Sequence, residues 1–219
     1  INRIPLKSQS AFLEGLQDRK ITVGNTTYNL PTFSFAIATM NPVELGQGTF
    51  PLSEAATDRF AIMVNIGYLP PEEEQRLVNF DFKQVHLNKL MSKERIVHLR
   101  GVITREVFLH EKLGKYIRRL VGATRPYNEE TDWLFHSPSD MVEQHVDLGA
   151  SPRATICWGR LVKVWALLVH RRAEVYPEDV QDLAKYVLSH RIWLGPHATS
   201  HGITSEQVIE DIVAKVPIP

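Results

Sequence analysis

Apolar and polar residues follow two different spacings along the first 30 residues of the chain. Residues 8–19 carry apolar side chains on one helical face, with Ser8 as the candidate N-cap, and this spacing predicts an amphipathic helix. Two β-rich runs then flank Gly24-Asn25, and such a pair between β-rich runs predicts a hairpin within Ile21–Leu30. A helix and a hairpin are therefore expected in this part of the chain.

Two later segments are apolar at nearly every position. Phe33–Ala38 and Phe60–Ile66 have the pattern of strands that are covered on both faces in a parallel sheet, and Ser53–Arg59 between them predicts a short helix. Strands with helical connections indicate an α/β architecture. Because two strands cannot form a stable sheet covered on both faces, we expect further strands from residues outside these 219.

After Pro70-Pro71 the pattern is that of helices alone. We therefore predict an α/β domain over residues 1–70 and an all-α domain over residues 71–219. Three consecutive glutamates follow Pro71 and suit the positive end of a helix dipole. Capping residues and apolar spacing predict later helices over 104–125 with Thr104 as the cap, over 152–172, from Pro177 and from Ser205 after a Thr204 capping box.

Two of these helices have a predicted buried face. In the helix that starts at Pro152, the residues expected to point inward are Ile156, Leu161, Val164, Trp165 and Leu168. In the helix that starts at Pro177, they are Val180, Leu183, Ala184, Val187 and Leu188.

Composition narrows the function classes without naming one. Lys plus Arg and Asp plus Glu both number 25, so the formal net charge is zero and no nucleic acid or membrane partner is implied. The single cysteine, Cys157, suits a reducing compartment and makes a cytoplasmic location the default expectation. No run approaches the roughly 18 apolar residues of a membrane span. His190, His197 and His201 are separated by helix-breaking glycine and proline residues, so no metal site is predicted.

Several strings of residues resemble the MoxR family of AAA+ ATPases. The longest is Phe35–Pro42, FAIATMNP, which is followed by GTFPLSEA at 48–55 and DRF at 58–60. The similarity spans essentially the whole chain, because further matching strings lie at Ile1-Asn2-Arg3, Gln9-Ser10-Ala11, Gly149–Ala154, Pro177–Val180 and Val216–Pro219. The fold implied by this resemblance is a partial P-loop NTPase core, with strands 4 and 5 and the pre-sensor 1 hairpin, followed by a helical lid domain.

The motifs that hold nucleotide are not found in these residues. In the family, Ile1-Asn2-Arg3 would directly follow the Walker B Asp-Glu, so we expect a chain that starts just after the magnesium-binding and catalytic acids. The G-x-x-x-x-G-K-[ST] pattern is also absent, since the only Gly-Lys pair, Gly114-Lys115, has Leu109 and Tyr116 where glycine and a hydroxyl belong. This chain alone is therefore expected to bind no ATP or Mg²⁺ and to be inactive.

Asn41 and Arg59 are the candidates for catalysis, and Arg153 is the candidate for nucleotide binding. Asn41, just after an apolar strand, matches sensor 1, which orients the attacking water; the alternative is that Asn41-Pro42 only starts a loop. Arg59 matches an arginine finger acting in trans on a neighbouring subunit; the alternative is a cation that favourably ends a short helix. Arg153 lies in the first helical turn, where a cation is disfavoured, so an anion should compensate it. It matches sensor 2, which by the resemblance reaches the nucleotide phosphates of the same subunit; the alternative partner is a carboxylate such as Asp147.

The resemblance implies a function for the full-length protein. It would be an ATP hydrolase that uses ATP and Mg²⁺ to remodel or mature client protein complexes like a chaperone, as a homo-oligomeric ring, with six subunits as the expected number. A partner with a von Willebrand factor A domain is implied in the same way. The alternative is a non-catalytic helical interaction module. A DNA-remodelling relative ranks last, because Ile21–Leu30 contains no Lys or Arg.

Overall fold

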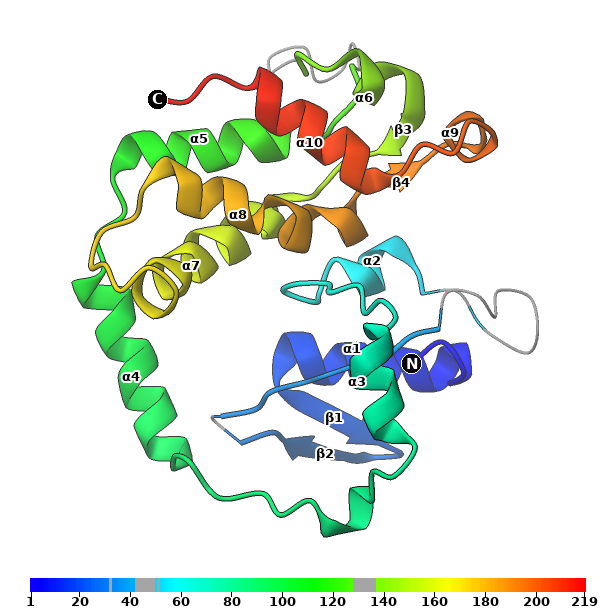
Figure 1. Ribbon diagram of the computed structural model, residues 1–219, viewed down its shortest axis with the longest axis vertical. Coiled ribbons are helices and arrows are strands. Elements are labelled where there is room, and N and C mark those ends of the chain that lie inside the picture. Colours follow the sequence, from blue (N-terminus) through cyan, green and yellow to red (C-terminus); the bar gives the residue numbers. More distant parts are fainter. Residues whose placement is uncertain (32, 42–49, 51, 128–136) are drawn as a thin grey trace.

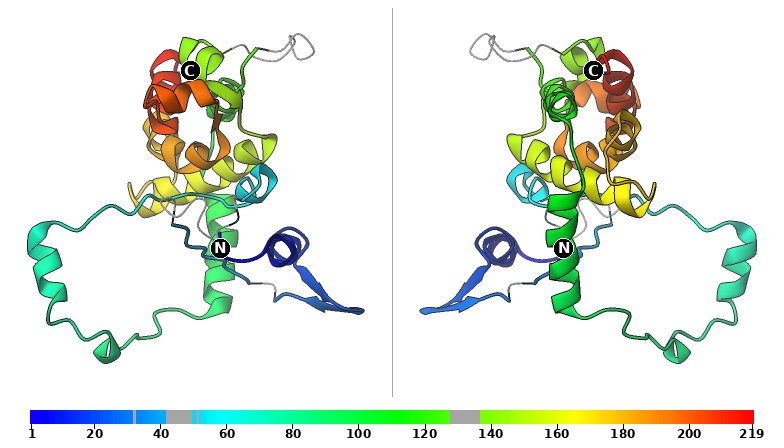
Figure 2. Two further views of the ribbon diagram at one scale, coloured as in Figure 1. Left: turned by 90° about the vertical axis from the view of Figure 1, so that its right-hand side faces the viewer. Right: turned by 90° about the vertical axis from the view of Figure 1, so that its left-hand side faces the viewer.

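The computed structural model describes all residues except 32, 42–49, 51 and 128–136. In Figure 1 a helical body lies above a more open region, and the long helix α4, Lys93–Glu106, runs downward from the body along one side. Figure 2 shows that the first hairpin and the segment around residues 66–92 extend to opposite sides of α4. The molecule therefore combines one packed unit with extended segments.

The start of the chain forms the predicted helix and hairpin. Helix α1, Leu6–Asp18, begins two residues before the predicted N-cap Ser8, because Pro5 occupies the N-cap position and sets the entry into the helix. The helix ends at Arg19 with φ 55, and strands β1, Lys20–Val23, and β2, Thr26–Asn29, pair antiparallel. Gly24 takes φ 60 in the turn between them, a left-handed conformation that glycine adopts without steric cost. The hairpin is confirmed.

The two predicted parallel strands are not formed among the described residues. Residues 34–41 and 62–70 are assigned to no helix or strand, and the described sheets are two antiparallel pairs, β1-β2 and β3-β4. A strand, unlike a helix, needs a neighbour to bond its backbone groups, and neither segment has one in the described part of the chain. The two strands are expected to need further strands from outside these residues, so the α/β domain over residues 1–70 stays a prediction, and Phe35 is 78% exposed.

Short helices follow in the middle of the chain. They are α2, Glu54–Thr57, α3, Pro71–Leu77, and the 3-10 turn η2, Phe82–Gln84. The prediction for α3 is confirmed, since proline occupies the first helical position and three glutamates form the first turn. The short helix predicted at Ser53–Arg59 is confirmed with narrower bounds.

The helix predicted over 104–125 is wrong in its start. Thr104 is not a cap but lies inside α4, where its hydroxyl donates to the Arg100 carbonyl at 2.8 Å. The chain then leaves helical geometry at Val107, and a second helix, α5, covers Glu111–Gly122 with His110 as its cap. The break is stabilised by backbone hydrogen bonds between Phe108 and the segment 173–175, which pair it with the α7–α8 connection.

The helical body contains more elements than predicted. They are α5, α6 (Asp140–His145), β3 (Val146–Leu148), α7 (Pro152–Leu168), α8 (Pro177–Leu188), η4 (Ser189–Arg191), β4 (Trp193–Leu194), α9 (Pro196–Ser200) and α10 (Ser205–Lys215). The predicted caps at Ser151 and Thr204 are confirmed, and Thr204 forms a capping box with Gln207. The short β3-β4 ladder means that this part is not all-α.

One core joins the helices of the body. The predicted inward face of α8 is confirmed, with all five residues buried. The predicted face of α7 is only partly right, because Leu161 and Trp165 pack partly buried against the core whereas Ile156 and Leu168 are 58% and 66% exposed. The residues of α7 that are buried are Ala154, Trp158, Val162 and Ala166. α7 is apolar on most of its circumference, so its spacing did not show which face meets α5 and α8.

Candidate functional site

Helix α2 presents Asp58 and Arg59 at its end. The Ser53 hydroxyl caps the helix by accepting from the Ala56 amide at 3.3 Å, and Ala56 is buried. Arg59 follows directly, and its guanidinium donates to the Ala55 carbonyl in the last turn. This is the local contact expected of a cation at a helix C-terminus, so the finger role of Arg59 stays a prediction.

Arg153 is placed by the N-terminus of α7. Ser151 caps that helix, and Pro152 occupies its first position. The Arg153 side chain, 48% exposed, forms an ion pair with Asp58 across 3.4 Å between NH1 and Oδ2. A carboxylate thus compensates the cation at the helix start, and it is Asp58 rather than Asp147.

The loop before α7 is held against the end of α5. The Ala150 amide donates to the Thr124 hydroxyl at 2.8 Å, and Arg125 Nε donates to the Ala150 carbonyl at 3.0 Å. A Cβ at Gly149 would lie 2.4 Å from the Thr124 carbonyl oxygen, so only glycine fits there. The string Gly149–Ala154 therefore fixes the start of α7 and, with it, the backbone of Arg153.

Sequence reasoning missed Arg191 of η4, which joins the two parts of the site. Its Nε donates to Asp58 Oδ1 at 3.1 Å, and its side chain is 2% exposed. The same carboxylate accepts from the Ser151 hydroxyl at 2.7 Å through Oδ2. Asp58 thus binds α7 and η4 together. No spacing signal marked Arg191, because its partner lies 133 residues away.

These side chains surround one cavity of about 380 Å³. Its charged lining residues are Asp58, Arg59, Arg153, Arg160 and Arg191, and its uncharged lining residues are Ala61, Ile156, Cys157 and Leu161. Four arginines and one carboxylate therefore line it, an excess of three positive charges (4 − 1), and two of the arginines, Arg153 and Arg191, are paired with that carboxylate. A surface with this charge suits an oxyanion such as phosphate and does not suit Mg²⁺, which prefers oxygen ligands.

Cys157 lines the cavity, and His190 directly precedes the lining residue Arg191. Burial raises the pKa of the Cys157 thiol, whose Sγ donates to the Ala61 carbonyl at 3.5 Å. Burial, followed by the neighbouring Arg191 charge, lowers the pKa of His190 to about 4. A neutral His190 donates from Nε2 to the Phe60 carbonyl at 3.0 Å. Neither group adds negative charge to the cavity at neutral pH.

Asn41 is not brought together with the two arginines. Its backbone carbonyl accepts from Asn2 Nδ2 at 3.1 Å, and its side chain is exposed. It does not line the cavity as far as the described residues define it, and residues 42–49 next to it lie outside the description. The sensor 1 role of Asn41 stays a prediction.

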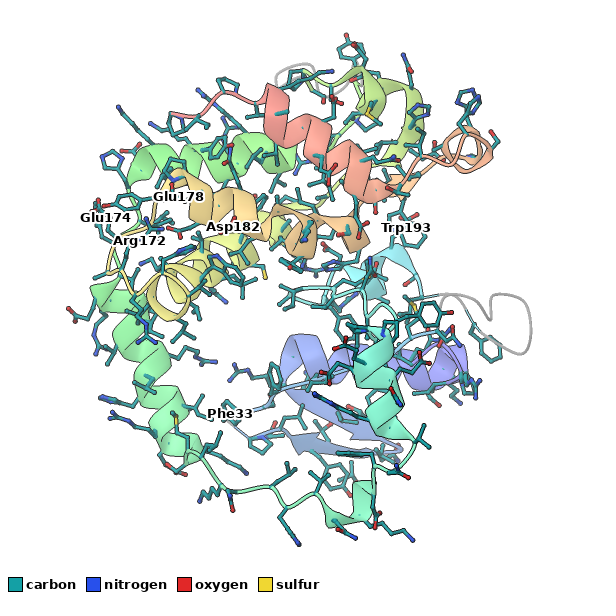
Figure 3. All side chains as sticks on the ribbon, in the orientation of Figure 1. Phe33, Arg172, Glu174, Glu178, Asp182 and Trp193 are labelled. Carbon is teal, nitrogen blue, oxygen red and sulfur yellow. The ribbon has the colours of Figure 1, made fainter. Side chains whose placement is uncertain are left out.

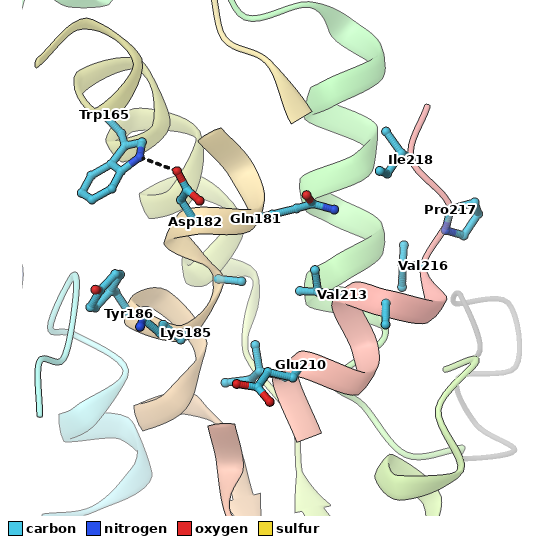
Figure 4. Close-up of a pocket in the computed structure, with 13 residues that line it drawn as sticks. Trp165, Gln181, Asp182, Lys185, Tyr186, Glu210, Val213, Val216, Pro217 and Ile218 are labelled. Carbon is cyan, nitrogen blue, oxygen red and sulfur yellow. Dashed lines mark hydrogen bonds between the residues drawn. The ribbon is translucent and has the colours of Figure 1, made fainter. Parts of the chain in front are cut away.

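A larger cavity, of about 890 Å³, lies elsewhere in the helical body (Figure 4). It is bordered by α8, α10 and the C-terminal residues, and Asp182 accepts from the Trp165 ring nitrogen there at 3.2 Å. None of the predicted site residues lines it. Its mixed lining has no cluster of like charge, so we place the candidate site at the smaller cavity.

Two negative findings apply to the described part of the chain. No described helix is both long and apolar enough to cross a bilayer. No described group of three or more His, Cys, Asp or Glu residues is arranged to hold a metal ion, and this includes the three histidines considered from the sequence.

Comparison with known proteins matches both parts of the chain. Residues 1–62 match the model of the ATPase family associated with various cellular activities, and residues 139–212 match the AAA lid domain. A crystal structure of a candidate ATPase from Cytophaga hutchinsonii superimposes with a TM-score of 0.83 at 38% identity, covering 100% of this chain and 64% of the other.

Curated relatives agree with these matches. The chain is 34% identical to Chaperone MoxR1 of Mycobacterium tuberculosis, covering 100% of the chain and 56% of the relative. It is 34% identical to the uncharacterised protein YeaC of Bacillus subtilis and 25% identical to Protein MoxR of Methylorubrum extorquens, in each case covering 63% of the relative. The chain thus spans less than two thirds of the length of these relatives.

Proposed function

Because this chain belongs to the MoxR family of AAA+ ATPases, we propose that it supplies phosphate-sensing arginines to an ATPase that remodels client protein complexes. The observation that carries the proposal is the cavity between α2, α7 and η4, which is lined by four arginines and by the single carboxylate of Asp58. A highly charged oxyanion binds favourably to such a surface, and phosphate is the oxyanion that ATP provides. The proposed location of the intact protein is the cytoplasm.

ATP supplies a γ-phosphoryl group whose oxygens carry negative charge through the transition state of its transfer. Arg59 and Arg153 would bind these oxygens, and Asn41 would orient the attacking water. In the present structure the Arg59 guanidinium donates to the Ala55 carbonyl, and the Arg153 guanidinium is paired with the Asp58 carboxylate at 3.4 Å. Both guanidinium groups would exchange these contacts for the phosphate, whose charge is larger.

Arg59 and Arg153 line one cavity of the same chain. We therefore propose that they serve the same nucleotide. With Arg59 acting in trans, this places Arg153 at the interface with the adjacent subunit, whereas the resemblance implies that Arg153 acts on the nucleotide of its own subunit. The nucleotide and Mg²⁺ would be held by the phosphate-binding loop and acidic residues of the adjacent subunit in a homo-oligomeric ring, proposed as a hexamer. A von Willebrand factor A domain protein stays a proposed partner of that ring.

The test is ATP hydrolysis by the full-length protein with Arg59→Ala and Arg153→Ala. We expect Arg59→Ala to lower kcat by about three powers of ten and Arg153→Ala by about one to two, with assembly unchanged. The matched control is Arg76→Ala, which removes an exposed arginine that is paired only with Glu73 of its own helix, and should keep the parent rate. Parent rates in both site variants would contradict the role given to the two arginines. No ATP hydrolysis by the unsubstituted full-length protein would instead support the non-catalytic interaction module.

A further inference from the structure

Arg191 contacts the peptide groups on both sides of Arg59. Its NH2 donates to the Asp58 carbonyl at 3.1 Å and to the Phe60 carbonyl at 2.6 Å. Its NH1 donates to the Ala61 carbonyl at 3.2 Å. Arg191 therefore holds the backbone from residue 58 to residue 61 at three points, and Arg59 lies inside that segment.

The contact is reinforced by a buried ion pair. Arg191 Nε and Asp58 Oδ1 are 3.1 Å apart, and the two side chains are 2% and 13% exposed. Charge-assisted bonds in such an environment are strong and strict in geometry. Only a planar guanidinium with five donors can serve a carboxylate and three carbonyls at once, and a lysine ammonium cannot.

Arg191 is also fixed to the helical body. It follows α8 in the turn η4, and its NH1 donates to the Val187 carbonyl in the last turn of α8. Val187 is itself buried in the core. A change in the orientation of the body is therefore carried through Arg191 to the backbone beside Arg59.

We propose that Arg191 is a positioning residue for Arg59, coupling the orientation of the helical body to the placement of the arginine finger. This inference rests on the proposed function. A guanidinium that must meet the γ-phosphate within hydrogen-bonding distance loses most of its effect when it is displaced by about 1 Å. Loss of Arg191 should therefore lower the rate of hydrolysis on the neighbouring subunit, not ATP binding by its own subunit.

A matched control lies at the other end of α8. Arg172 forms a similar pair with a buried carboxylate, donating from NH2 to Asp179 Oδ1 at 2.7 Å. Figure 3 places Arg172 near Glu178 at the α7–α8 connection, and Arg172 does not line the smaller cavity. Arg172→Ala therefore removes a comparable ion pair from the same body without touching the segment around Arg59.

The experiment mixes full-length subunits and measures ATP hydrolysis. Arg191→Ala alone should lower kcat about 10- to 100-fold and change KM for ATP less than about twofold. Arg191→Ala is then mixed in equal amounts with a second variant that keeps Arg59 and Arg191 but cannot bind ATP. Activity should be regained, because about one interface in four joins an intact nucleotide site of one subunit to a correctly placed Arg59 of the other. Arg172→Ala should keep the parent kcat.

Three results decide the matter. The same mixing experiment is carried out with Arg59→Ala in place of Arg191→Ala. If activity recovers in the Arg59→Ala mixtures but not in the Arg191→Ala mixtures, the positioning role of Arg191 is overturned and the proposed function stands. Failure of Arg59→Ala mixtures to recover would instead contradict the action of Arg59 in trans. If Arg191→Ala does not fold, Arg191→Lys takes its place. Its kcat should lie between those of the parent and of Arg59→Ala, and activity should recover in the same mixtures. A parent-level kcat in a folded Arg191→Lys variant would also overturn the inference.

Discussion

The helical body and the extended segments 34–41 and 62–70 are both rich in apolar residues, but the body buries these side chains and the extended segments leave several of them exposed. In the body, apolar side chains of α5, α7, α8 and α10 form one buried cluster. In the extended segments, Phe35, Ile37, Val64 and Ile66 are exposed. A helix bonds its own backbone and needs only a surface to cover, whereas a strand also needs neighbouring strands. The comparison shows why the helices of the body are formed while the two predicted parallel strands are not.

The largest contrast between the regions should come from two aromatic truncations. Trp158→Ala removes a fully buried side chain and should lower the free energy of unfolding of the body by about 3–5 kcal/mol. Phe35→Ala removes an exposed one and should change it by less than about 0.5 kcal/mol. Urea unfolding followed by tryptophan fluorescence and circular dichroism measures both. Equal losses would mean that Phe35 packs against the body.

The contact between the regions should break most readily at Asp58. Asp58→Asn leaves the buried Arg191 without a carboxylate and should cost about 3 kcal/mol in the contact between α2 and the body. The control is Glu73→Gln, which breaks the exposed pair with Arg76 and should cost less than about 0.5 kcal/mol. Hydrogen exchange at residues 54–63 reports the loss locally. Unchanged protection there in Asp58→Asn would contradict the role given to this pair.

Within the body, two glycines should respond in opposite directions. Gly149→Ala places a methyl group against the Thr124 backbone and should destabilise the body by about 1–3 kcal/mol. Gly114→Ala, inside α5 with open space around it, should stabilise it by about 0.5–1 kcal/mol. Thermal unfolding of the two variants measures the signs. A neutral Gly149→Ala would show that the loop before Arg153 is not held as described.

The last prediction concerns pH, and protonation of His190 has no effect on stability at neutral pH. The pKa of His190 is lowered to about 4 in the fold, so between about 4 and its ordinary value of 6.5 the unfolded chain binds the extra proton. This group therefore contributes its full stability above pH 6.5, and that contribution falls with decreasing pH until about 4. His190→Gln should reduce the slope of unfolding free energy against pH by up to about 1.4 kcal/mol per unit in that window. An unchanged slope would contradict the assignment.

The sequence predicted local features of the fold well and tertiary partners poorly. The caps at Ser151 and Thr204, the buried face of α8 and the Gly24 turn follow from interactions within a few residues, and all are confirmed. The buried face of α7 depends on which helices surround it, and its apolar residues occur on most sides. The break at Val107 depends on a partner at 173–175.

The candidate site divides in the same way. Arg59 and Arg153 were found from strings that resemble a family, and the structure brings them to one cavity. Asp58, which pairs with Arg153, and Arg191, which pairs with Asp58, could not be found by spacing because the contacts join residues 95 and 133 positions apart. The charge of Arg153 in a first helical turn correctly indicated that an anion compensates it, without identifying Asp58.

A structure of the intact protein with ADP and a γ-phosphate mimic is the most direct test of the central claim. The account predicts that Arg59 leaves the Ala55 carbonyl and that Arg59 and Arg153 of one subunit both lie within hydrogen-bonding distance of the mimic held by the next, with Arg191 still bonded around residues 58–61. A mimic contacted by neither arginine would contradict it.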